Sequence, residues 1–148
     1  MAAMTREEAY AFIDAGPRWA ILTTVGPGGY PHAVPLSYYR DGDAVFVNAR
    51  GARLANLRRR PEVALLLEGG EEMTDLRGLL IEGDAELVEE PAEVLRLSRI
   101  AAHKRGAGDE DLPSEPRPGL IWARINPRRM RSWDNTQRRS GRPGGPAR

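Results

Sequence analysis

The pattern of apolar and polar positions along the chain predicts a small domain in which strands outnumber helices. Ala9, Phe12 and Ile13 recur at helical spacing behind Thr5, an N-cap residue with Glu8 three positions further on. Later windows are short, alternate weakly and are rich in β-branched and aromatic residues, which is typical of strands. We predict helices at 5–15, 51–60 and 91–104, and strands at 18–25, 30–40, 44–49, 62–69, 76–90 and 120–133.

Turn residues indicate how the first strands connect. The runs GPGG (26–29) and DGD (41–43) predict tight turns, so the first three strands are expected to form an antiparallel meander. Pro31 and Pro35 remove backbone donors from the second strand, which favours a sheet edge or a bulge.

The later strands complete the fold prediction. EVALLLEG (62–69) is almost continuously apolar, which predicts a strand buried on both faces, and Gly78 and Gly83 predict bulges or barrel corners in the next strand. Six strands in mostly antiparallel connection, with short helices beside them, predict a mainly β (α+β) fold of the closed or split barrel type.

The length of 148 residues corresponds to one domain, which we place at residues 1–136. Residues 137–148 (QRRSGRPGGPAR) offer no apolar side chain able to pack, and they are predicted to form a disordered basic tail. The acidic, amphipathic start lacks the apolar core of a signal peptide, and no stretch has the length and apolarity of a membrane span. We therefore expect a cytoplasmic protein with no membrane partner.

Composition excludes several kinds of chemistry. The chain has no cysteine, so disulfides, thiolate catalysis and cysteine-ligated metals are excluded. Its two histidines, His32 and His103, share no metal-site spacing with acidic residues, and no metal is expected. No serine has a nucleophile-elbow context. The formal net charge of +1 gives no general reason to expect a nucleic-acid partner.

The segment NARGARLANLRRRP (48–61) is the most informative one. Arg50 and Gly51 come at the start of its predicted helix, where free N–H groups and the helix dipole favour an anion, and Arg53 lies on the first turn. Two interpretations remain open from these residues alone, a phosphate site and a solvated basic helix. Arg58–Arg60 lie further along and are expected to face solvent.

Two further segments have alternative interpretations. In the strand at 30–40, alternation places His32, Val34, Leu36 and Tyr38 on one face, and Ala33, Pro35, Ser37 and Tyr39 on the other. The backbone groups left unpaired by Pro35 either bind the edge of a heterocycle or belong to an ordinary edge strand. Trp133 is either a core or dimer-interface residue, or a cover for a ligand of a partner subunit.

Residues 17–134 resemble the pyridoxamine 5′-phosphate oxidase-like split β-barrel superfamily, and within it the flavin- or deazaflavin (F420)-dependent oxidoreductases. The resemblance is carried, in order, by RWAILTTVGPGGYPHAVPLSYY, DGDAVFVNARGARLANLRRRPEVALLLEG, RGLLIEGDAELV and RMRSWD. Its most specific part is the block formed by a basic residue, NLRR, one further residue, proline and a buried apolar strand.

The resemblance implies a homodimer with FMN or F420 at two interface sites. Arg53 matches a basic position that binds the cofactor phosphate, and Arg50 is a second phosphate ligand. The remaining implied cofactor-binding residues are Val34, Pro35, Leu36 and Ser37 beside the ring, Val47, Asn48 and Ala49 on the adjacent strand, and Trp133 from the last strand.

Two departures from the family pattern matter. Arginine stands at position 53 in place of the commoner lysine, and Gly51 stands where some F420-binding relatives carry a basic residue. The C-terminal arginine and histidine motifs of the vitamin oxidases are not found, so oxidation of pyridoxamine phosphate is not expected.

These observations predict an oxidoreductase that transfers a hydride between F420 or FMN and a small unsaturated organic acceptor. Because the cofactor carries the chemistry, no catalytic side chain is assigned, although Ser37, Tyr38 and Tyr39 become proton-donor candidates if they face the ring. The alternative is a non-catalytic flavin, F420 or haem carrier on the same fold. A nucleic-acid binder using Arg58–Arg60 is the third hypothesis and is not favoured.

Overall fold

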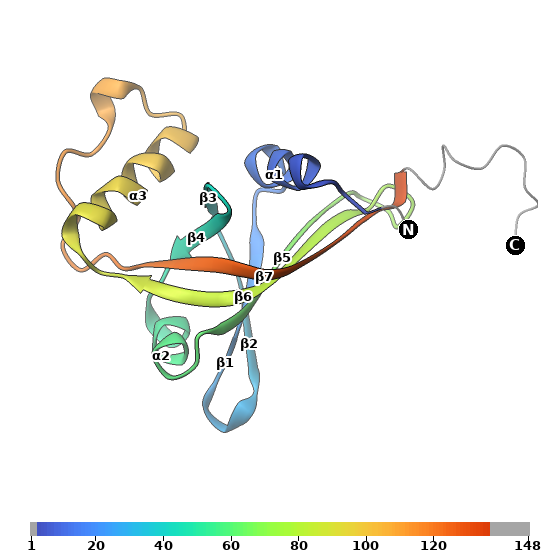
Figure 1. Cartoon of the computed structure of the whole chain (residues 1–148), viewed down its shortest axis with the longest axis horizontal. Coiled ribbons are helices and arrows are strands. Elements are labelled where there is room, and N and C mark those ends of the chain that lie inside the picture. Colours follow the sequence, from blue (N-terminus) through green and yellow to red (C-terminus); the bar gives the residue numbers. More distant parts are fainter. Residues whose placement is uncertain (1–2, 137–148) are drawn as a thin grey trace, which may run out of the picture.

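Figure 1 shows the arrangement of the chain in a computed structural model, which describes residues 3–136. The predicted tail, 137–148, lies outside the described residues. The helices and strands are α1 (Arg6–Ala15), β1 (Ala20–Val25), η1 (Pro27–Gly29), β2 (Pro31–Leu36), β3 (Tyr39–Asp41), β4 (Ala44–Asn48), α2 (Gly51–Arg59), β5 (Glu62–Gly69), β6 (Arg77–Val88), α3 (Pro91–Lys104), η2 (Asp109–Asp111) and β7 (Trp122–Asp134).

Within residues 3–136, seven strands form one antiparallel sheet in the order β2-β1-β5-β6-β7-β4-β3. The hydrophobic pattern predicts six strands, because residues 30–40 have the pattern of a single strand. In the structure, this segment divides into β2 and β3, which pair with β1 and β4 respectively. The antiparallel pairs predicted at the two turns are confirmed, but the continuous meander is wrong, since β2 and β3 lie at opposite edges of the sheet. The edge position predicted from Pro31 and Pro35 is confirmed.

The short connection between β2 and β3 closes the sheet into a barrel. Only Ser37 and Tyr38 separate Leu36 from Tyr39. Three Cα–Cα steps of ~3.8 Å allow the two edges to be at most about 11 Å apart. The edge strands are not hydrogen-bonded neighbours, so a seam remains between them. The predicted mainly β (α+β) split barrel with flanking short helices is thereby confirmed.

The core fills the inside of this curled sheet. Alternate residues of the central strands are fully buried there, among them Leu22, Leu65 and Ile81. The strand predicted to be buried on both faces, β5, instead alternates: Val63, Leu65 and Leu67 are buried, whereas Ala64 and Leu66 are half-buried on the outer face. This prediction was wrong because an apolar run does not by itself reveal which side chains lack a covering element.

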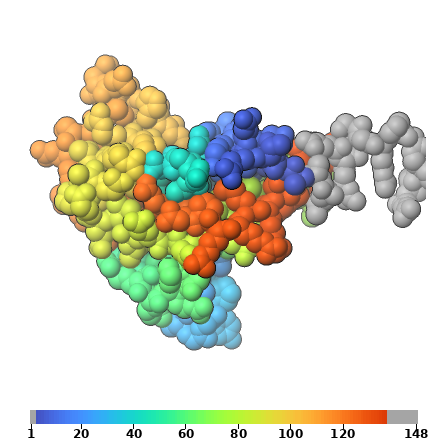
Figure 2. Space-filling model, in the orientation of Figure 1, coloured from blue at the N-terminus to red at the C-terminus, as the bar shows by residue number. Residues whose placement is uncertain are grey.

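The helices lie at the ends and sides of the barrel. In Figures 1 and 2, α1 lies above the sheet and α2 below it, and α3 lies to the left with the loop that follows it. The predicted cap of α1 is confirmed, because the Thr5 side chain accepts a hydrogen bond from the backbone N–H of Glu8 at 3.1 Å. No helix in the described part of the chain is long and apolar enough to cross a membrane.

Two glycines of β6 permit close approaches to β7. At Gly83 the register shifts, and a Cβ atom there would lie 2.3 Å from the carbonyl oxygen of Asn126, so the predicted bulge is confirmed. Gly78 keeps a regular register, so of the two predicted alternatives, a bulge or a barrel corner, the bulge is not found there. Its missing side chain instead admits the Trp133 ring, which a Cβ would approach to 2.2 Å.

A charged cluster joins α3 to the edge of the sheet. The Asp41 carboxylate on β3 accepts hydrogen bonds from Arg96 on α3, at 2.7 and 3.0 Å, and from Arg124 on β7. Glu93 also binds Arg96. The hydrogen bonds from Arg96, followed by those from Arg124, lower the pKa of Asp41 to about 2.

We predict that Asp41→Asn lowers the stability of the protein and weakens its dependence on acid. The Asp41 carboxylate binds a proton less readily in the folded chain than in the unfolded chain. Its contribution to the free energy of unfolding is therefore fully present above about pH 5 and is lost as the pH falls toward 2. We expect a loss of about 1 kcal/mol at pH 7, given solvent screening of this partly exposed cluster. Urea unfolding at pH 7 and at pH 3 measures both effects.

Asp109→Asn, an exposed substitution on η2, is the matched control and should leave both midpoints unchanged. An equal gap between Asp41→Asn and the parent at both pH values would contradict the role of the Asp41 carboxylate.

Candidate functional site

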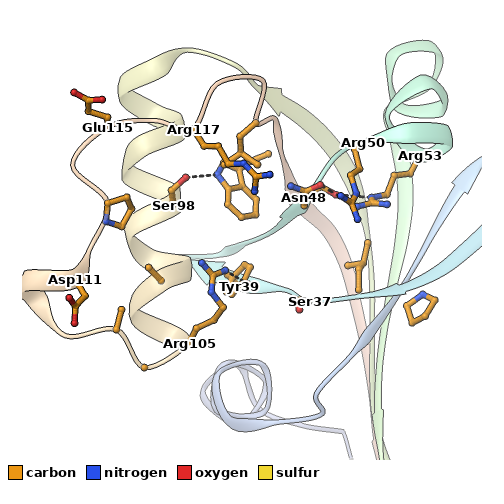
Figure 3. A pocket seen from close by; sticks show the side chains of 18 residues that line it. Ser37, Tyr39, Asn48, Arg50, Arg53, Ser98, Arg105, Asp111, Glu115 and Arg117 are labelled. Atoms are coloured by element: carbon orange, nitrogen blue, oxygen red, sulfur yellow. Dashed lines mark hydrogen bonds between the residues drawn. The ribbon is translucent and has the colours of Figure 1, made fainter.

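A groove of about 970 Å³ opens at the seam between the two sheet edges. Its walls are formed by the end of β2, the end of β4, the start of α2, the C-terminal part of α3, the loop at 105–119 and the start of β7. Figure 3 shows side chains from these elements turning toward a common space. Segments distant in the sequence thus meet at one place.

One end of the groove is formed by the start of α2. The Arg53 guanidinium is half-buried and is held by Asn48, with Nε donating to the Asn48 carbonyl oxygen at 2.7 Å and Nη2 to its Oδ1 at 3.3 Å. Burial, followed by repulsion from Arg50, lowers the pKa of Arg53. An anion placed beside both guanidinium groups would relieve this repulsion.

The helix start adds backbone donors to this end. Arg50 is the N-cap residue of α2 in extended conformation, and its side chain makes no capping hydrogen bond. The first N–H groups of an α-helix have no intrahelical partner, so a ligand can bind them. Gly51 has φ +61°, a conformation that other residues adopt only with strain, which explains glycine at this position. The donor set of two guanidinium groups and a helix start fits a phosphate.

The floor of the groove is aromatic. The buried rings of Tyr39 and Trp122 meet edge to face with centroids 5.8 Å apart, and both pack on Phe46. Trp122 Nε1 donates to Ser98 Oγ at 3.1 Å, and Ser98 Oγ donates to the Val94 carbonyl oxygen at 2.7 Å. The floor is therefore fixed to α3 and can support a flat ligand.

The far wall comes from the end of α3 and the loop behind it. Arg105 and Arg117 line the groove there, and the Nη1 of Arg105 donates to the Tyr39 hydroxyl at 2.8 Å. In Figure 3 both arginine side chains turn toward the floor, whereas Asp111 and Glu115 point outward. The loop is attached to α3 by Arg99, which donates to the Pro113 carbonyl oxygen at 2.9 Å.

The seam beside the groove is stabilised by Tyr38. Its hydroxyl donates to the Pro17 carbonyl oxygen at 2.5 Å, and burial raises its pKa to about 12. Lys104 Nζ donates to the Tyr38 carbonyl oxygen at 2.7 Å and lies 4.0 Å from the centre of the Tyr38 ring. Of the three proton-donor candidates, Ser37 and Tyr39 line the groove, and Tyr38 does not.

The structure brings together six of the ten residues predicted to bind a cofactor. The residues that line the groove are Pro35, Leu36, Ser37, Asn48, Arg50 and Arg53. Val47 and Ala49 are buried in the core beneath it, and Val34 packs against the same core. Trp133 lies at the other end of β7 from Trp122, about 36 Å away at ~3.3 Å per residue. In one chain, Trp133 does not reach the groove.

Several groove residues were missed by the sequence analysis. They include Ser98, Arg105, Arg117 and Trp122. Trp122 is given no role in the site from the sequence, and the loop at 105–119 has no motif that marks it. The one available signal was the RG dipeptide at the end of the third helix, where a basic side chain follows the last turn.

The other basic and metal-binding candidates lie elsewhere. Arg58–Arg60 are exposed, as predicted, and Arg58 and Arg60 pair with Glu89 and Glu62. Neither His32 nor His103 lines the groove, so neither is placed to ligate a haem iron there. Among the described residues, no group of three or more potential metal ligands is found.

The comparisons with known proteins agree with this fold. A family model described as pyridoxamine 5′-phosphate oxidase matches residues 5–134. The conserved hypothetical protein Rv2991 from Mycobacterium tuberculosis is 30% identical over 97% of this chain and 92% of its own, with a TM-score of 0.81. No curated protein is significantly similar in sequence.

Two more distant structures share the fold. A FAD-binding protein from Mesorhizobium loti is 16% identical, with 88% of this chain and 95% of that chain covered and a TM-score of 0.69. General Stress Protein 26 from Bacillus anthracis is 20% identical, with 87% and 94% covered and a TM-score of 0.63. At these identities the similarity shows the fold alone.

Proposed function

The chain belongs to the pyridoxamine 5′-phosphate oxidase family, and on this basis we propose that it is a homodimeric oxidoreductase dependent on FMN or F420. It transfers a hydride between this cofactor and a small unsaturated organic acceptor. The FAD-binding fold neighbour from Mesorhizobium loti supports a flavin-type cofactor as a class.

The observation that carries the proposal is the phosphate-shaped donor set at the start of α2. Arg53 is already oriented by two hydrogen bonds to Asn48. These use two of the five N–H groups of its guanidinium, and the others are left for a ligand. Arg50 and the uncapped helix start lie beside it. A preorganised guanidinium loses less conformational entropy on binding than a free one.

The remaining groove residues orient and shield the cofactor ring. Bound there, FMN or F420 supplies the hydride chemistry. Pro35 has no N–H, and the edge strand β2 leaves backbone groups beside the ring position for hydrogen bonding. The floor formed by Tyr39 and Trp122 excludes water from below. The Ser37 hydroxyl and the Tyr39 hydroxyl line the groove and are the candidates to hold a proton for the acceptor.

The outer face of the sheet supports the homodimer. Ile21, Leu66 and Leu80 lie in one register row across β1, β5 and β6, all half-exposed and with no helix of the described chain over them. Trp19 is 49% exposed, and Trp133 lies over Gly78 on the same face as Leu80. A second copy covering this face would bury the row and bring its Trp133 into the interface.

We predict that Arg53→Ala weakens the binding of FMN or F420 by about 1.5–3 kcal/mol, the range for hydrogen bonds to charged groups. The purified protein is titrated with each cofactor, and fluorescence gives the dissociation constants. Reduction of an enone by the loaded protein then separates an enzyme from a carrier.

Arg58→Ala is the matched control, because it removes the same charge from the exposed side of the same helix. Equal dissociation constants for Arg53→Ala and the parent, with both cofactors, would refute the phosphate site. Cofactor binding without turnover on any acceptor would favour the carrier alternative.

We predict that Leu66→Glu converts the dimer into monomers, because it places a carboxylate in the centre of the apolar row. Size-exclusion chromatography with light scattering measures the mass. Ala92→Glu, at an exposed position on α3, introduces the same charge as a control and should remain dimeric. A monomeric parent protein, or a Leu66→Glu variant that remains dimeric, would contradict this assignment.

A further inference from the structure

We propose that Arg105 and Arg117 form a second anion-binding end of the groove, and that it selects an acceptor bearing a carboxylate next to its unsaturated bond. This inference rests on the proposed function and names the substrate class of the same site.

The charges of the groove are the first argument. Four arginines line it, Arg50 and Arg53 at the α2 end and Arg105 and Arg117 at the α3 end. None of the four forms an ion pair with a carboxylate of the described residues, whereas arginines elsewhere, such as Arg40 and Arg96, do. Asp111 and Glu115 line the same groove but point outward (Figure 3). Among the described residues, the α3 end therefore has two guanidinium groups that no carboxylate pairs with.

The placement of Arg105 is the second argument. It follows the last turn of α3, where its backbone N–H bonds to the carbonyl oxygens of Ala101 and His103. Its guanidinium donates to the hydroxyl of Tyr39, a residue only 5% exposed, and lies 5.7 Å from the centre of that ring. A buried phenol thus orients this guanidinium over the floor, with further N–H donors left for a ligand.

The chemistry of the groove selects the ligand class. Two guanidinium groups bind a carboxylate with paired, charge-assisted hydrogen bonds. The floor between the two ends is formed by Tyr39, Trp122 and Leu36, which suits a flat apolar body and offers no cation or carboxylate. A ligand that satisfies both features carries a carboxylate at one end and a planar unsaturated group beside it.

The separation of the two ends defines which ligand occupies which. The α2 end combines two arginines with a helix start, which matches a phosphate. The α3 end has no helix N-terminus, since α3 ends there. It therefore suits the smaller, planar carboxylate of the acceptor, and the two anions do not compete for the same donors.

Calorimetric titration with cinnamate and with its neutral amide, cinnamamide, tests this inference on the full chain without cofactor. These probes differ in charge and share the conjugated double bond and the ring. We expect the parent protein to bind cinnamate at least ~10-fold more tightly than cinnamamide. Arg105→Ala and Arg117→Ala should each raise the dissociation constant of cinnamate by ~10-fold or more and change that of cinnamamide by less than ~2-fold. Arg105→Lys, which keeps the charge and removes the planar fork, should lie between the two.

Arg60→Ala is the control for total charge, because Arg60 is exposed at the other end of α2. Urea unfolding of each variant establishes that it is folded, and Arg105→Lys keeps the test valid if the loss of the bond to Tyr39 destabilises Arg105→Ala. Equal affinity of the parent protein for cinnamate and cinnamamide would overturn the inference.

Cofactor titrations of the same variants distinguish two sources of the anion. F420 carries carboxylates on its tail, whereas FMN does not. Suppose that Arg105→Ala and Arg117→Ala weaken the binding of F420 but not of FMN, and that the parent protein binds cinnamate and cinnamamide equally well. The α3 end of the groove then binds the cofactor, and its assignment to the acceptor is wrong. If the parent binds neither cofactor yet prefers cinnamate, the proposed function fails and the carboxylate end stands.

Discussion

The rest of the structure depends on one covalent constraint, the two residues that join opposite edges of the sheet. Ser37 and Tyr38 connect β2 to β3, so a seven-stranded sheet has to curl until its edge strands nearly meet. Tyr38 fixes this junction from both sides, with its hydroxyl bound to Pro17 and its carbonyl oxygen bound to Lys104. The curl creates an enclosed core and, at the seam, a line where the backbone is not paired. Backbone groups without strand partners are those that a ligand can use.

The seam also explains why the groove contains so many element ends. The end of β2, the end of β4, the start of α2, the end of α3 and the start of β7 all converge on it. Regular structure satisfies backbone groups in the middle of an element and leaves them free at its ends. The barrel supplies rigidity, and the convergent ends supply the donors, which is how binding residues are commonly carried by loops on a fixed scaffold.

Local features of the fold could be predicted from the sequence because they depend on neighbouring residues. Thr5 caps α1, Pro91 opens α3, and Gly83 marks a bulge, each through a contact or a conformation within a few positions or in an adjacent strand. The division of residues 30–40 into two strands was not predictable in this way, because Ser37 and Tyr38 are not typical turn residues. The division follows only from the pairing of β2 with β1 and of β3 with β4.

The candidate site was predictable to the same degree and for the same reason. Arg53 and Asn48 lie five residues apart, so a short motif contains both residues. The resemblance to a family then implied that both bind a cofactor. Arg105 binds Tyr39, which is 66 positions away, and no pattern in the chain links them.

Net charge was a poor guide to the electrostatics of this molecule. The formal charge of +1 is the balance of 22 basic and 21 acidic residues, and it does not reveal that the arginines fall into two groups. Those on the outside of the barrel and on α3, such as Arg40, Arg58 and Arg96, are paired with carboxylates and stabilise the fold. Two of the four groove arginines are instead held by neutral oxygens, those of Asn48 for Arg53 and of Tyr39 for Arg105. A neutral acceptor orients a guanidinium without neutralising it, and a low-dielectric floor strengthens its attraction for an anion. The chain thus combines a near-zero total charge with four arginines gathered in one groove. On the proposed function, this separation would let one small barrel bind anions at the groove without attracting polyanions over its whole surface.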